Sequence, residues 1–490
     1  MTTCQAPRVR AFNARLFASQ PRRQGRGFTL LELLVVLVII GLLAGYVGPK
    51  FFAQIGKSEV KTAAAQIDAL GKAADQYRLD TGHYPTTEQG LGALWVKPSD
   101  EPRWWGPYLR KAPPKDPWGR EYQYRGEVVS LDDPASPWVT SCPIKCHALG
   151  PGKSSYGYTS RLVPWLKAHR GNYDLVIVNG IWQYHSLAVW RALAGTSTPY
   201  FVYTHGMLDP WFKRTYPLKH LKKWLYWPWA EYRVLRDATA VMFTCENERL
   251  LARQSFWLYQ ADEYVVNYGT SAPPADAVEQ RQLFLNRFPN LVDKRCLLFL
   301  GRVHEKKGPD LLLKAFAQAL THLPPEQAHK LHLIMAGPAD DAYGEQMKAL
   351  AQSLGLVDRI TWTGMLSGDS KWGAFRQADA FILPSHQENF GIAVAEALAC
   401  GVPVLISNQV NIWREIQQDG CGWVEADDLA GTLRLIERWA RIPPEDWAVM
   451  RGHAKACFNQ RFLIERSAES LTHAMDLYKV TSADTRLATS

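Results

Sequence analysis

Two carboxylates, Glu388 and Glu396, lie eight residues apart at the start of an expected helix. The segment Ser385-His-Gln-Glu-Asn-Phe-Gly follows the apolar, strand-like run Ala380–Pro384, and an Ala-rich stretch then continues to Gly401. A helix N-terminus presents unpaired backbone N–H groups and a partial positive charge, which suits a phosphate. Carboxylates accept hydrogen bonds from sugar hydroxyls. The spacing therefore predicts a site for a phosphate and a sugar at one helix N-terminus.

A second loop supplies positive charge. The segment Gly301-Arg-Val-His-Glu-Lys-Lys-Gly follows another buried-strand pattern and also opens a helix. Arg302 and Lys307 are placed to neutralise a diphosphate beside that helix N-terminus. A basic helix start on the surface is the alternative interpretation, and the carboxylate motif downstream favours the phosphate site. Lys306 precedes the Lys-Gly pair by one residue, and we expect it to be solvated.

These loops require a scaffold that brings strand ends together. Strand-like runs recur through the C-terminal two thirds of the chain, with helical stretches between most of them, which predicts parallel sheets covered by helices. The runs are Leu175–Val178, Tyr200–Tyr203, Ala240–Phe243, Tyr264–Val266, Leu297–Leu300, Leu331–Met335, Ile360–Trp362, Ala380–Leu383 and Val404–Ile406. The Pro- and Ala-rich segment 270–277 is a plausible hinge between two such units.

Together, the two loops resemble the donor-binding motif of retaining glycosyltransferases of family 4. The resemblance implies an α/β fold of GT-B type, a pair of Rossmann-like domains at 127–277 and 278–445, the first one incomplete. Helices at 446–480 would return to the first domain, and 481–490 would be a disordered tail. The implied activity is that of a hexosyltransferase, with a nucleotide-sugar donor as substrate, no metal or other cofactor, and a glycan or lipid-linked acceptor.

The same resemblance assigns roles to individual residues. Glu388 would hydrogen-bond the donor sugar, and Glu396 would hold the nucleotide ribose, although a solvated helix carboxylate is the plain alternative. Phe390 and Gly391 would offer backbone N–H groups, and Arg302 and Lys307 would meet the leaving diphosphate.

Further positions belong to the rim of the expected cleft. Gly337 and Gly364 end strands where the base would sit, although any strand-ending glycine would look the same. His205 aligns with a family histidine that contacts the transferred sugar, whereas a lone histidine is more often structural. Thr244 is expected to be a helix N-cap. The aromatic and basic stretch Trp211–Trp229 would touch a membrane surface or a lipid-linked acceptor, or else pack in the interior.

The N-terminus has a different character. Residues 1–27 contain arginines and no acidic residue, and between Gly27 and Lys50 the only charge is Glu32. At about 1.5 Å per helical residue, the apolar run spans a bilayer core, which predicts a single-pass transmembrane helix at 28–49 in the inner membrane. The arginines would keep the N-terminus cytoplasmic and place the chain beyond the apolar run in the periplasm. Nucleotide sugars are cytoplasmic, so the side of the catalytic domain stays open.

Gly27-Phe-Thr-Leu-Leu-Glu resembles the prepilin-peptidase site of type IV pilins and pseudopilins. The resemblance implies a leader at 1–27, cleavage after Gly27, N-methylation of Phe28, and pairing of Glu32 with the new amine of a neighbouring subunit. An intramembrane carboxylate is functional by default because it is costly unless paired. An ordinary signal anchor with a stray glutamate is the alternative. Residues 27–125 resemble the major pseudopilin of type II secretion, whose implied partners are the prepilin peptidase and other secretion subunits.

Where the two family-like regions meet, near residue 126, each lacks a part of the family that it resembles. The pseudopilin head, an α+β region at 50–126, lacks the family's C-terminal calcium loop. The segment Glu127–Pro134 looks like the second strand of a GT-B N-terminal domain, without the family's first strand and its Gly-rich loop. Loss of a central strand would expose backbone and apolar surface. A membrane-tethered glycosyltransferase, a pseudopilus subunit and a defective gene fusion with neither activity therefore remain as alternatives.

The composition of the chain argues against several classes of function. The chain of 490 residues has a net charge of +9 without a dense basic run, which does not indicate nucleic-acid binding. Its 8 cysteines are scattered, which argues against a disulfide framework. Cys142-x-x-x-Cys146-His147 lacks a second pair of ligands, so we expect no metal there.

Overall fold

The computed structural model describes residues 62–478, apart from positions 63–64, 67–68, 75, 83, 87–88, 118, 120, 122–125 and 143. The predicted leader, the apolar segment 28–49 with its processing residues Gly27, Phe28 and Glu32, and the tail 481–490 lie outside the described residues. Among the helices of the described part, none combines the length and hydropathy needed to cross a bilayer. The chain divides into two compact units, Met1–Arg125 and Gly126–Ser490.

The first unit is held together by aromatic side chains. Residues 69–74 and 76–81 are helical, and a short 3-10 turn, η1 (Leu91–Leu94), comes after them. Tyr77 and Leu94 are fully buried. The ring of Tyr108 meets those of Tyr77 and Trp104 edge-on, with centroids 5.5 and 5.6 Å apart. These contacts give the small unit a core of its own.

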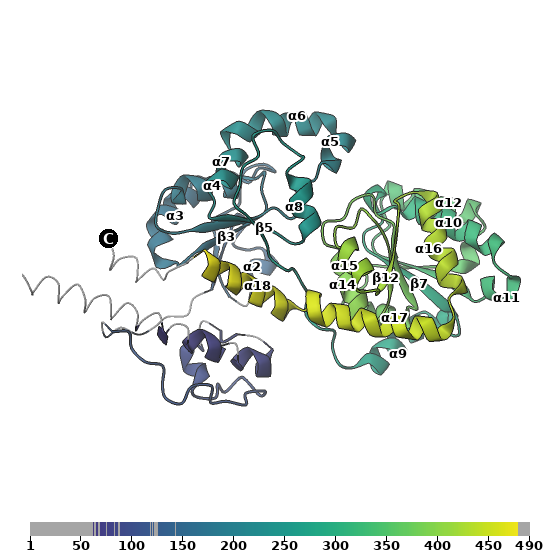
Figure 1. Ribbon diagram of the computed structural model, residues 1–490, viewed down its shortest axis with the longest axis horizontal. Coiled ribbons are helices and arrows are strands. Elements are labelled where there is room, and N and C mark those ends of the chain that lie inside the picture. The colour runs from purple at the N-terminus through teal and green to yellow at the C-terminus, as the bar shows by residue number, and fades with distance from the viewer. Residues whose placement is uncertain are drawn as a thin grey trace, which may run out of the picture. The chain divides into compact units, whose positions relative to one another are not determined.

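The second unit contains two larger parallel sheets and a separate parallel pair of strands (Figure 1). The larger sheet has the order β12-β11-β10-β7-β8-β9. Its strands are β7 (Arg295–Leu300), β8 (Leu331–Ala336), β9 (Ile360–Gly364), β10 (Ala380–Leu383), β11 (Val404–Ser407) and β12 (Gly422–Glu425). From β7 the chain first builds β8 and β9 on one side and then β10, β11 and β12 on the other. This reversal places a switch point between β7 and β10, the position at which doubly wound sheets bind their ligands.

Helices connect these strands and cover the sheet. They are α9 (Ala277–Arg287), α10 (Pro309–His322), α11 (Pro325–Ala328), α12 (Ala342–Ser353), α13 (Gly368–Gln377), α14 (Ile392–Ala399), α15 (Trp413–Gln418) and α16 (Leu429–Arg441). The central strands are continuous apolar runs, because helices bury both of their faces.

The smaller sheet, in the N-terminal half of this unit, has the order β3-β4-β5-β6. Its strands are β3 (Val176–Asn179), β4 (Tyr200–Tyr203), β5 (Ala240–Phe243) and β6 (Glu263–Val265). The helices of this half include α2 (Pro137–Thr140), α3 (Leu162–His169), α4 (Tyr184–Leu193), α5 (Trp211–Thr215), α6 (Pro217–Tyr226), α7 (Glu231–Arg236) and α8 (Glu246–Ala252). All nine runs predicted from the sequence coincide with strands.

Among the described residues, no strand joins the two parallel sheets of the N-terminal half. β1 (Glu127–Ser130) and β2 (Lys145–Ala148) form a separate parallel pair, and β3 stands at the edge of its own sheet. In the C-terminal half the matching order is β9-β8-β7-β10, so β2-β1 and β3 flank the place that β7 would take. Among the described residues, β1 and β3 each keep one unpaired edge. The described residues therefore supply no strand that pairs with both β1 and β3.

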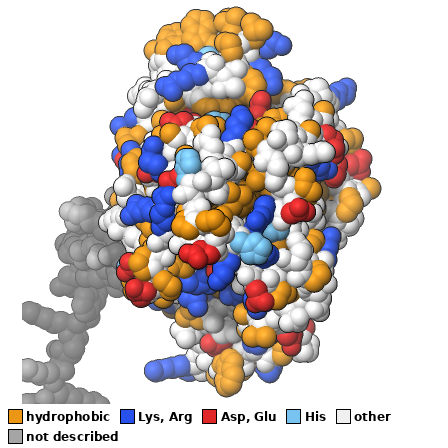
Figure 2. Space-filling view, turned by 90° about the vertical axis from the view of Figure 1, so that its right-hand side faces the viewer, with side chains coloured by type: hydrophobic (Ala, Val, Ile, Leu, Met, Phe, Trp, Pro, Cys, Tyr) orange, Lys and Arg blue, Asp and Glu red, His pale blue; other side chains and the backbone are white. Residues whose placement is uncertain are grey.

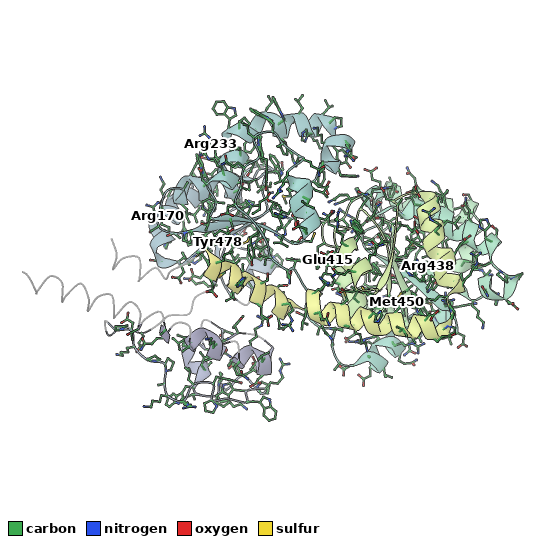
Figure 3. The ribbon with its side chains drawn as sticks, in the orientation of Figure 1. Arg170, Arg233, Glu415, Arg438, Met450 and Tyr478 are labelled. Atoms are coloured by element: carbon green, nitrogen blue, oxygen red, sulfur yellow. The ribbon has the colours of Figure 1, made fainter. Side chains whose placement is uncertain are left out.

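The end of the chain returns to the N-terminal half. α17 (Pro444–Cys457) and the turn η7 (Phe458–Phe462) lead into α18 (Ile464–Leu477). Ala474 of α18 packs in one apolar cluster with Phe201 and Met242 of the smaller sheet. Tyr478 follows directly after α18 (Figure 3). Its hydroxyl donates a hydrogen bond of 2.8 Å to Asp262. This helix therefore connects the two halves of the unit.

Candidate functional site

Lys307 and Glu388 meet at the switch point. Lys307 comes from the loop after β7, and its Nζ forms an ion pair with Glu388 Oε2 from the loop after β10. Gly308, at φ 64°, follows Lys307, and a Cβ at this position would lie 2.3 Å from the carbonyl oxygen of Pro384. Only glycine permits this approach, so it allows the two loops to close on each other.

The Glu388 backbone is fixed by a third loop. Its N–H donates to the Gln409 carbonyl at 3.0 Å, and its carbonyl accepts from the Asn411 N–H at 2.9 Å. The loop after β11 is thus paired with the loop after β10, as in a short parallel bridge. The carboxylate therefore projects from a backbone that is held on both sides.

The N-terminus of α14 follows directly. Gly391, at φ 78°, is its N-cap, and its carbonyl accepts from the Val394 N–H at 2.8 Å. The Phe390 ring is buried and meets the rings of Tyr268 and Phe462 at 5.1 and 5.5 Å. These rings come from the two segments that join the halves. Phe390 therefore anchors the loop through its side chain, while the backbone role predicted for it concerns its N–H.

Glu396 lies one turn further along α14 and is almost buried. Lys371 of α13 places its Nζ 2.7 Å from Glu396 Oε1. No motif in the sequence marks Lys371 as this partner. Arg302, in contrast, is exposed, and its side chain makes no hydrogen bond or ion pair with another described residue. The structure thus pairs the two carboxylates with lysines and leaves the arginine available.

Glycines close the rim of the sheet. The Gly301 N–H donates to the Ala336 carbonyl and the Gly337 N–H to the Gly364 carbonyl, both at 2.9 Å. Gly337 has φ 144°, and a Cβ there would lie 2.0 Å from the Gly301 carbonyl oxygen. The ends of β7, β8 and β9 can approach one another only because this residue has no side chain.

The expectation that Lys306 is solvated is wrong. Its side chain is partly buried, with Nζ 5.7 Å from the ring centroid of Phe212 in the N-terminal half. Burial lowers the pKa of Lys306, while the Glu388 carboxylate opposes that shift. Two neighbouring lysines of the short turn η5 (Glu305–Lys307) therefore make different contacts. Lys307 pairs with Glu388, and Lys306 faces the N-terminal half.

His205 stands at the end of β4 with an unusual backbone. Its φ is 48°, its ring stacks on Tyr203 at 5.5 Å, and its Nε2 lies 3.2 Å from Asn179 Oδ1. Burial lowers the pKa of His205, and the Glu248 carboxylate opposes that shift. A left-handed conformation in a residue other than glycine persists only when its surroundings hold it.

Glu248 supplies that support. Its buried carboxylate accepts hydrogen bonds from the Thr204 hydroxyl at 2.8 Å and the Gly206 N–H at 2.5 Å. It also accepts from the Thr244 N–H and hydroxyl, at 2.8 and 2.7 Å. One carboxylate therefore fixes the ends of both β4 and β5, including the turn that carries His205.

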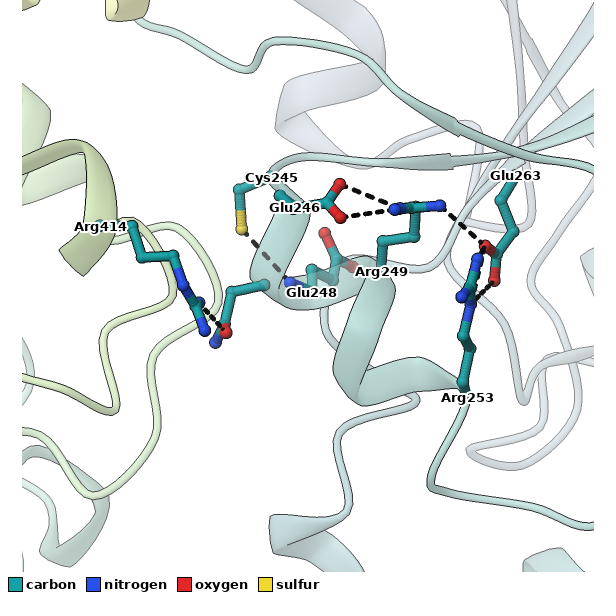
Figure 4. Close-up of polar contacts among 8 residues, drawn as sticks. Cys245, Glu246, Glu248, Arg249, Arg253, Glu263 and Arg414 are labelled. Atoms are coloured by element: carbon teal, nitrogen blue, oxygen red, sulfur yellow. Dashed lines mark hydrogen bonds and ion pairs between the residues drawn. The ribbon is translucent and has the colours of Figure 1, made fainter. Parts of the chain in front are cut away.

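The N-cap prediction for Thr244 is wrong by one position. Cys245 is the N-cap of α8, and its sulfur accepts from the Glu248 N–H at 3.5 Å (Figure 4). Thr244 is instead held by the Glu248 carboxylate. A threonine normally makes the better cap, but here its hydroxyl already donates to a buried charge.

Polar side chains of the carboxylate motif join the two halves. Gln387 Nε2 donates to Asp209 Oδ2 at 3.1 Å, and Asn389 Nδ2 donates to Thr244 Oγ1 at 3.2 Å. The only sequence signal for these contacts was the polar character of the residues beside Glu388. The motif therefore positions the N-terminal half in addition to presenting its carboxylates.

A cavity lies beside this site and is lined by residues of both halves. It has a volume of about 660 Å³ and is lined by residues that include Trp211, Glu305, Lys306, Tyr343 and His386. The two carboxylates and Lys307 are not among its lining residues.

Comparisons with known families agree with this division of the chain. Residues 282–440 match the family Glycosyl transferases group 1, and residues 109–269 match the Glycosyl transferase 4-like domain. Residues 50–132 match Type II secretion system (T2SS), protein G, and residues 22–47 match the Prokaryotic N-terminal methylation motif. The chain belongs to the type II secretion protein G family and continues as a family 4 glycosyltransferase.

Curated relatives of the protein G region are similar in detail. The type II secretion system core protein G of Vibrio cholerae is 49% identical over 105 residues, which are 21% of this chain and 71% of that protein. The core protein G of Dickeya chrysanthemi is 50% identical over 105 residues, or 21% of this chain and 68% of its own length.

Solved structures resemble the glycosyltransferase region. Anabaena HepE in complex with UDP and glucose aligns with a TM-score of 0.57 and 16% identity, over 71% of this chain and 91% of that chain. Sucrose-phosphate synthase from Thermosynechococcus elongatus aligns with a TM-score of 0.56 and 19% identity, over 72% and 89% of the two chains. At this identity the likeness shows the fold, and it confirms the GT-B prediction.

Proposed function

We propose that residues 127–480 form a glycosyltransferase that binds a nucleotide-sugar donor and is built to transfer its sugar to a glycan or lipid-linked acceptor, with retention at the anomeric carbon and without a metal cofactor. In the unmodified chain, the lack of the family's first strand impairs the transfer step and leaves donor binding in place. The observation that carries this proposal is the meeting of Lys307 and Glu388 at the switch point between β7 and β10. In doubly wound sheets, ligands bind outside the carboxyl ends of the strands at such a point.

The charges divide between the two parts of a donor. Lys307 and Arg302, with the helix N-termini behind them, neutralise the diphosphate and stabilise it as the leaving group. The ion pair of the free protein then opens, so that Lys307 turns to phosphate and Glu388 accepts hydrogen bonds from sugar hydroxyls. Because lysine and arginine supply this charge, the diphosphate needs no metal ion.

The remaining residues hold the other parts of the donor. Glu396 binds the ribose hydroxyls, Gly337 lies beside the base, and the N–H groups of Phe390 and Gly391 meet the diphosphate. His205 contacts the transferred sugar from the opposite half. The bound UDP and glucose of Anabaena HepE favour UDP as the first nucleotide to test.

Calorimetry on the full-length protein in detergent, with a chelator present, tests the donor site. UDP should bind, and Lys307→Ala should weaken binding by about 1.5–3 kcal/mol, the range for a hydrogen bond to a charged group. Lys314→Ala is the matched control, since Lys314 forms a half-exposed pair with Asp310 on the same helix α10. Equal affinities of the wild type and Lys307→Ala would remove the role proposed for Lys307.

A second candidate function is that of a pseudopilus subunit in the inner membrane, with the prepilin peptidase and other secretion subunits as partners. The close similarity to protein G and the methylation motif favour it. Mass spectrometry of the mature protein tests it: cleavage after Gly27 should leave a methylated Phe28. An intact Met1, or a cut after the apolar segment, contradicts this candidate. A defective fusion, the third alternative, would show neither activity.

A further inference from the structure

A hairpin of the N-terminal half exposes large apolar side chains. It comprises α5, α6 and the turn η3 (Trp227–Trp229). Leu218, Leu221 and Leu225 of α6 are 77%, 53% and 60% exposed. Their spacing of three and four residues places them on one face, named here the α6 leucine face. Trp229 at the end of the hairpin is 71% exposed. The interior packing considered for this stretch is therefore wrong for these side chains.

The opposite face of α6 is polar and points inward. His220 stacks on the ring of Phe256 at 4.7 Å, and Lys223 lies 4.5 Å from the ring centroid of Trp182. Burial lowers the pKa of Lys223 to about 8. A helix at the surface of a soluble protein normally turns its apolar face to the core. Here the orientation is reversed, which leaves the leucines for a partner outside the protein.

Basic residues surround the apolar surface. Lys213, Arg214, Lys219 and Lys222 are all exposed, and the sequence from Pro210 to Ala230 contains no acidic residue. Figure 2 shows hydrophobic side chains at the top of the molecule, where α6 lies in Figure 1, with Lys and Arg side chains beside them. A second copy would bring the same positive charges together, which opposes self-association through this face.

We propose that the α6 leucine face and Trp229 insert into the interface of an anionic lipid bilayer, while the surrounding lysines and arginine contact its phosphate headgroups. Apolar side chains on one face and basic ones at its border are the features of a helix that lies in a membrane surface. Anionic lipid attracts each basic residue, and the exposed leucines leave water.

The hairpin is linked to the candidate donor site. The Tyr216 hydroxyl donates to Glu305 at 2.9 Å, and Phe212 faces Lys306. Both contacts reach the turn that carries Lys307. Docking would therefore bring this turn close to the bilayer, which makes a lipid-linked acceptor the substrate class for the transfer. That last step rests on the proposed function, whereas bilayer contact by α6 does not.

Site-specific fluorescence in the full-length protein separates contact by α6 from anchoring by the N-terminus. An environment-sensitive dye is attached to Leu221→Cys, in a background with Cys4→Ser, Cys142→Ser and Cys146→Ser. The control is Val278→Cys on α9, a position that is 83% exposed. On vesicles containing phosphatidylglycerol, the dye at 221 should shift to the blue and be quenched by brominated lipid, and the dye at 278 should not.

The remaining outcomes either support or overturn the proposal. Replacing Lys219 and Lys222 by Gln should reduce the response at 221 to that seen on neutral phosphatidylcholine. No shift at 221, or equal shifts at both positions, would overturn the proposal. A shift without vesicles that grows with protein concentration would indicate a second copy instead and would equally overturn it. UDP affinity, measured on the same proteins, reports separately on the donor site.

Discussion

Lys371 Nζ lies 2.7 Å from Glu396 Oε1, so the carboxylate proposed to bind ribose already has a cationic partner in the free protein. Lys371 stands on α13, after β9, and Glu396 stands on α14, after β10. The pair therefore fixes the orientation of Glu396 across two strand-end helices. Lys371 is a positioning residue in this arrangement, because it acts on the ligand through Glu396.

Lys371→Met should weaken UDP binding by about 1 kcal/mol, since a mispositioned carboxylate loses part of one hydrogen bond. Glu396→Gln should weaken it too, and the double variant should lose less than the sum, because both changes act on one contact. Pyrophosphate binding should stay unchanged in all three, since it has no ribose. Additive losses, or a loss with pyrophosphate, would show that Lys371 acts elsewhere.

Gly337→Ala should destabilise the C-terminal half by at least about 2 kcal/mol, because the residue sits at φ 144° with no room beside the Gly301 carbonyl. Denaturant unfolding followed by fluorescence measures the change. Gly452→Ala is the matched control: no atom lies within 4 Å of a Cβ there, and α17 is regular at this point. That change should be neutral or stabilise by roughly 0.5–1 kcal/mol.

Glu231 should make stability depend on pH. Its buried carboxyl accepts from the Trp182 N–H at 2.7 Å, and burial raises its pKa from 4.5 to about 7. The pKa of Glu231 is higher in the folded protein than in the unfolded chain. Its contribution to the free energy of unfolding is therefore fully present below pH 4.5 and is lost as the pH rises through about 7. At about 1.4 kcal/mol per pKa unit, the loss is roughly 3 kcal/mol.

Unfolding measured at pH 5 and pH 8 tests the effect of Glu231. Glu231→Gln should remove most of the difference between the two pH values, because glutamine does not ionise. Glu279→Gln, at an exposed position of α9, should leave it in place. If the free energy of unfolding of Glu231→Gln still falls between pH 5 and pH 8 as much as that of the wild type, a group other than Glu231 causes the pH dependence.

The strands were predictable because their apolar runs reflect burial on both faces. β2 and β12 were missed: Lys145-Cys-His-Ala and Gly422-Trp-Val-Glu have few apolar residues, as strands at sheet edges can. The loops that carry Lys307 and Glu388 could be found because their charged residues and glycines lie close together in the sequence. The partners Lys371 and Glu248 could not, since only tertiary packing sets their distances. The aromatic and basic composition of Trp211–Trp229 left membrane contact and interior packing open, because composition does not show which side chains turn outward.

The unmodified chain should bind UDP yet show little or no sugar transfer. Transfer needs donor and acceptor held in register, and the described residues supply no strand between β1 and β3 to help hold the acceptor. Replacing residues 1–126 with about forty residues that supply a first strand, a Gly-rich loop and a helix should restore turnover. Release of free UDP in the presence of lipid-linked acceptors measures it. Full turnover by the unmodified chain would show that transfer does not need this strand.

The separation of β1 and β2 from β3 also changes where the N-terminal half opens most easily. In an ordinary sheet, amide hydrogens exchange fastest at the outer strands and slowest in the middle. Here β1 and β2 are held to the rest of this half by side chains, such as the Tyr173 hydroxyl that donates to Glu127, without a shared backbone ladder with β3. We therefore expect amide exchange to be fastest where β1 and β2 meet the rest of this half, with β1 and β2 opening together while β4 and β5 stay protected.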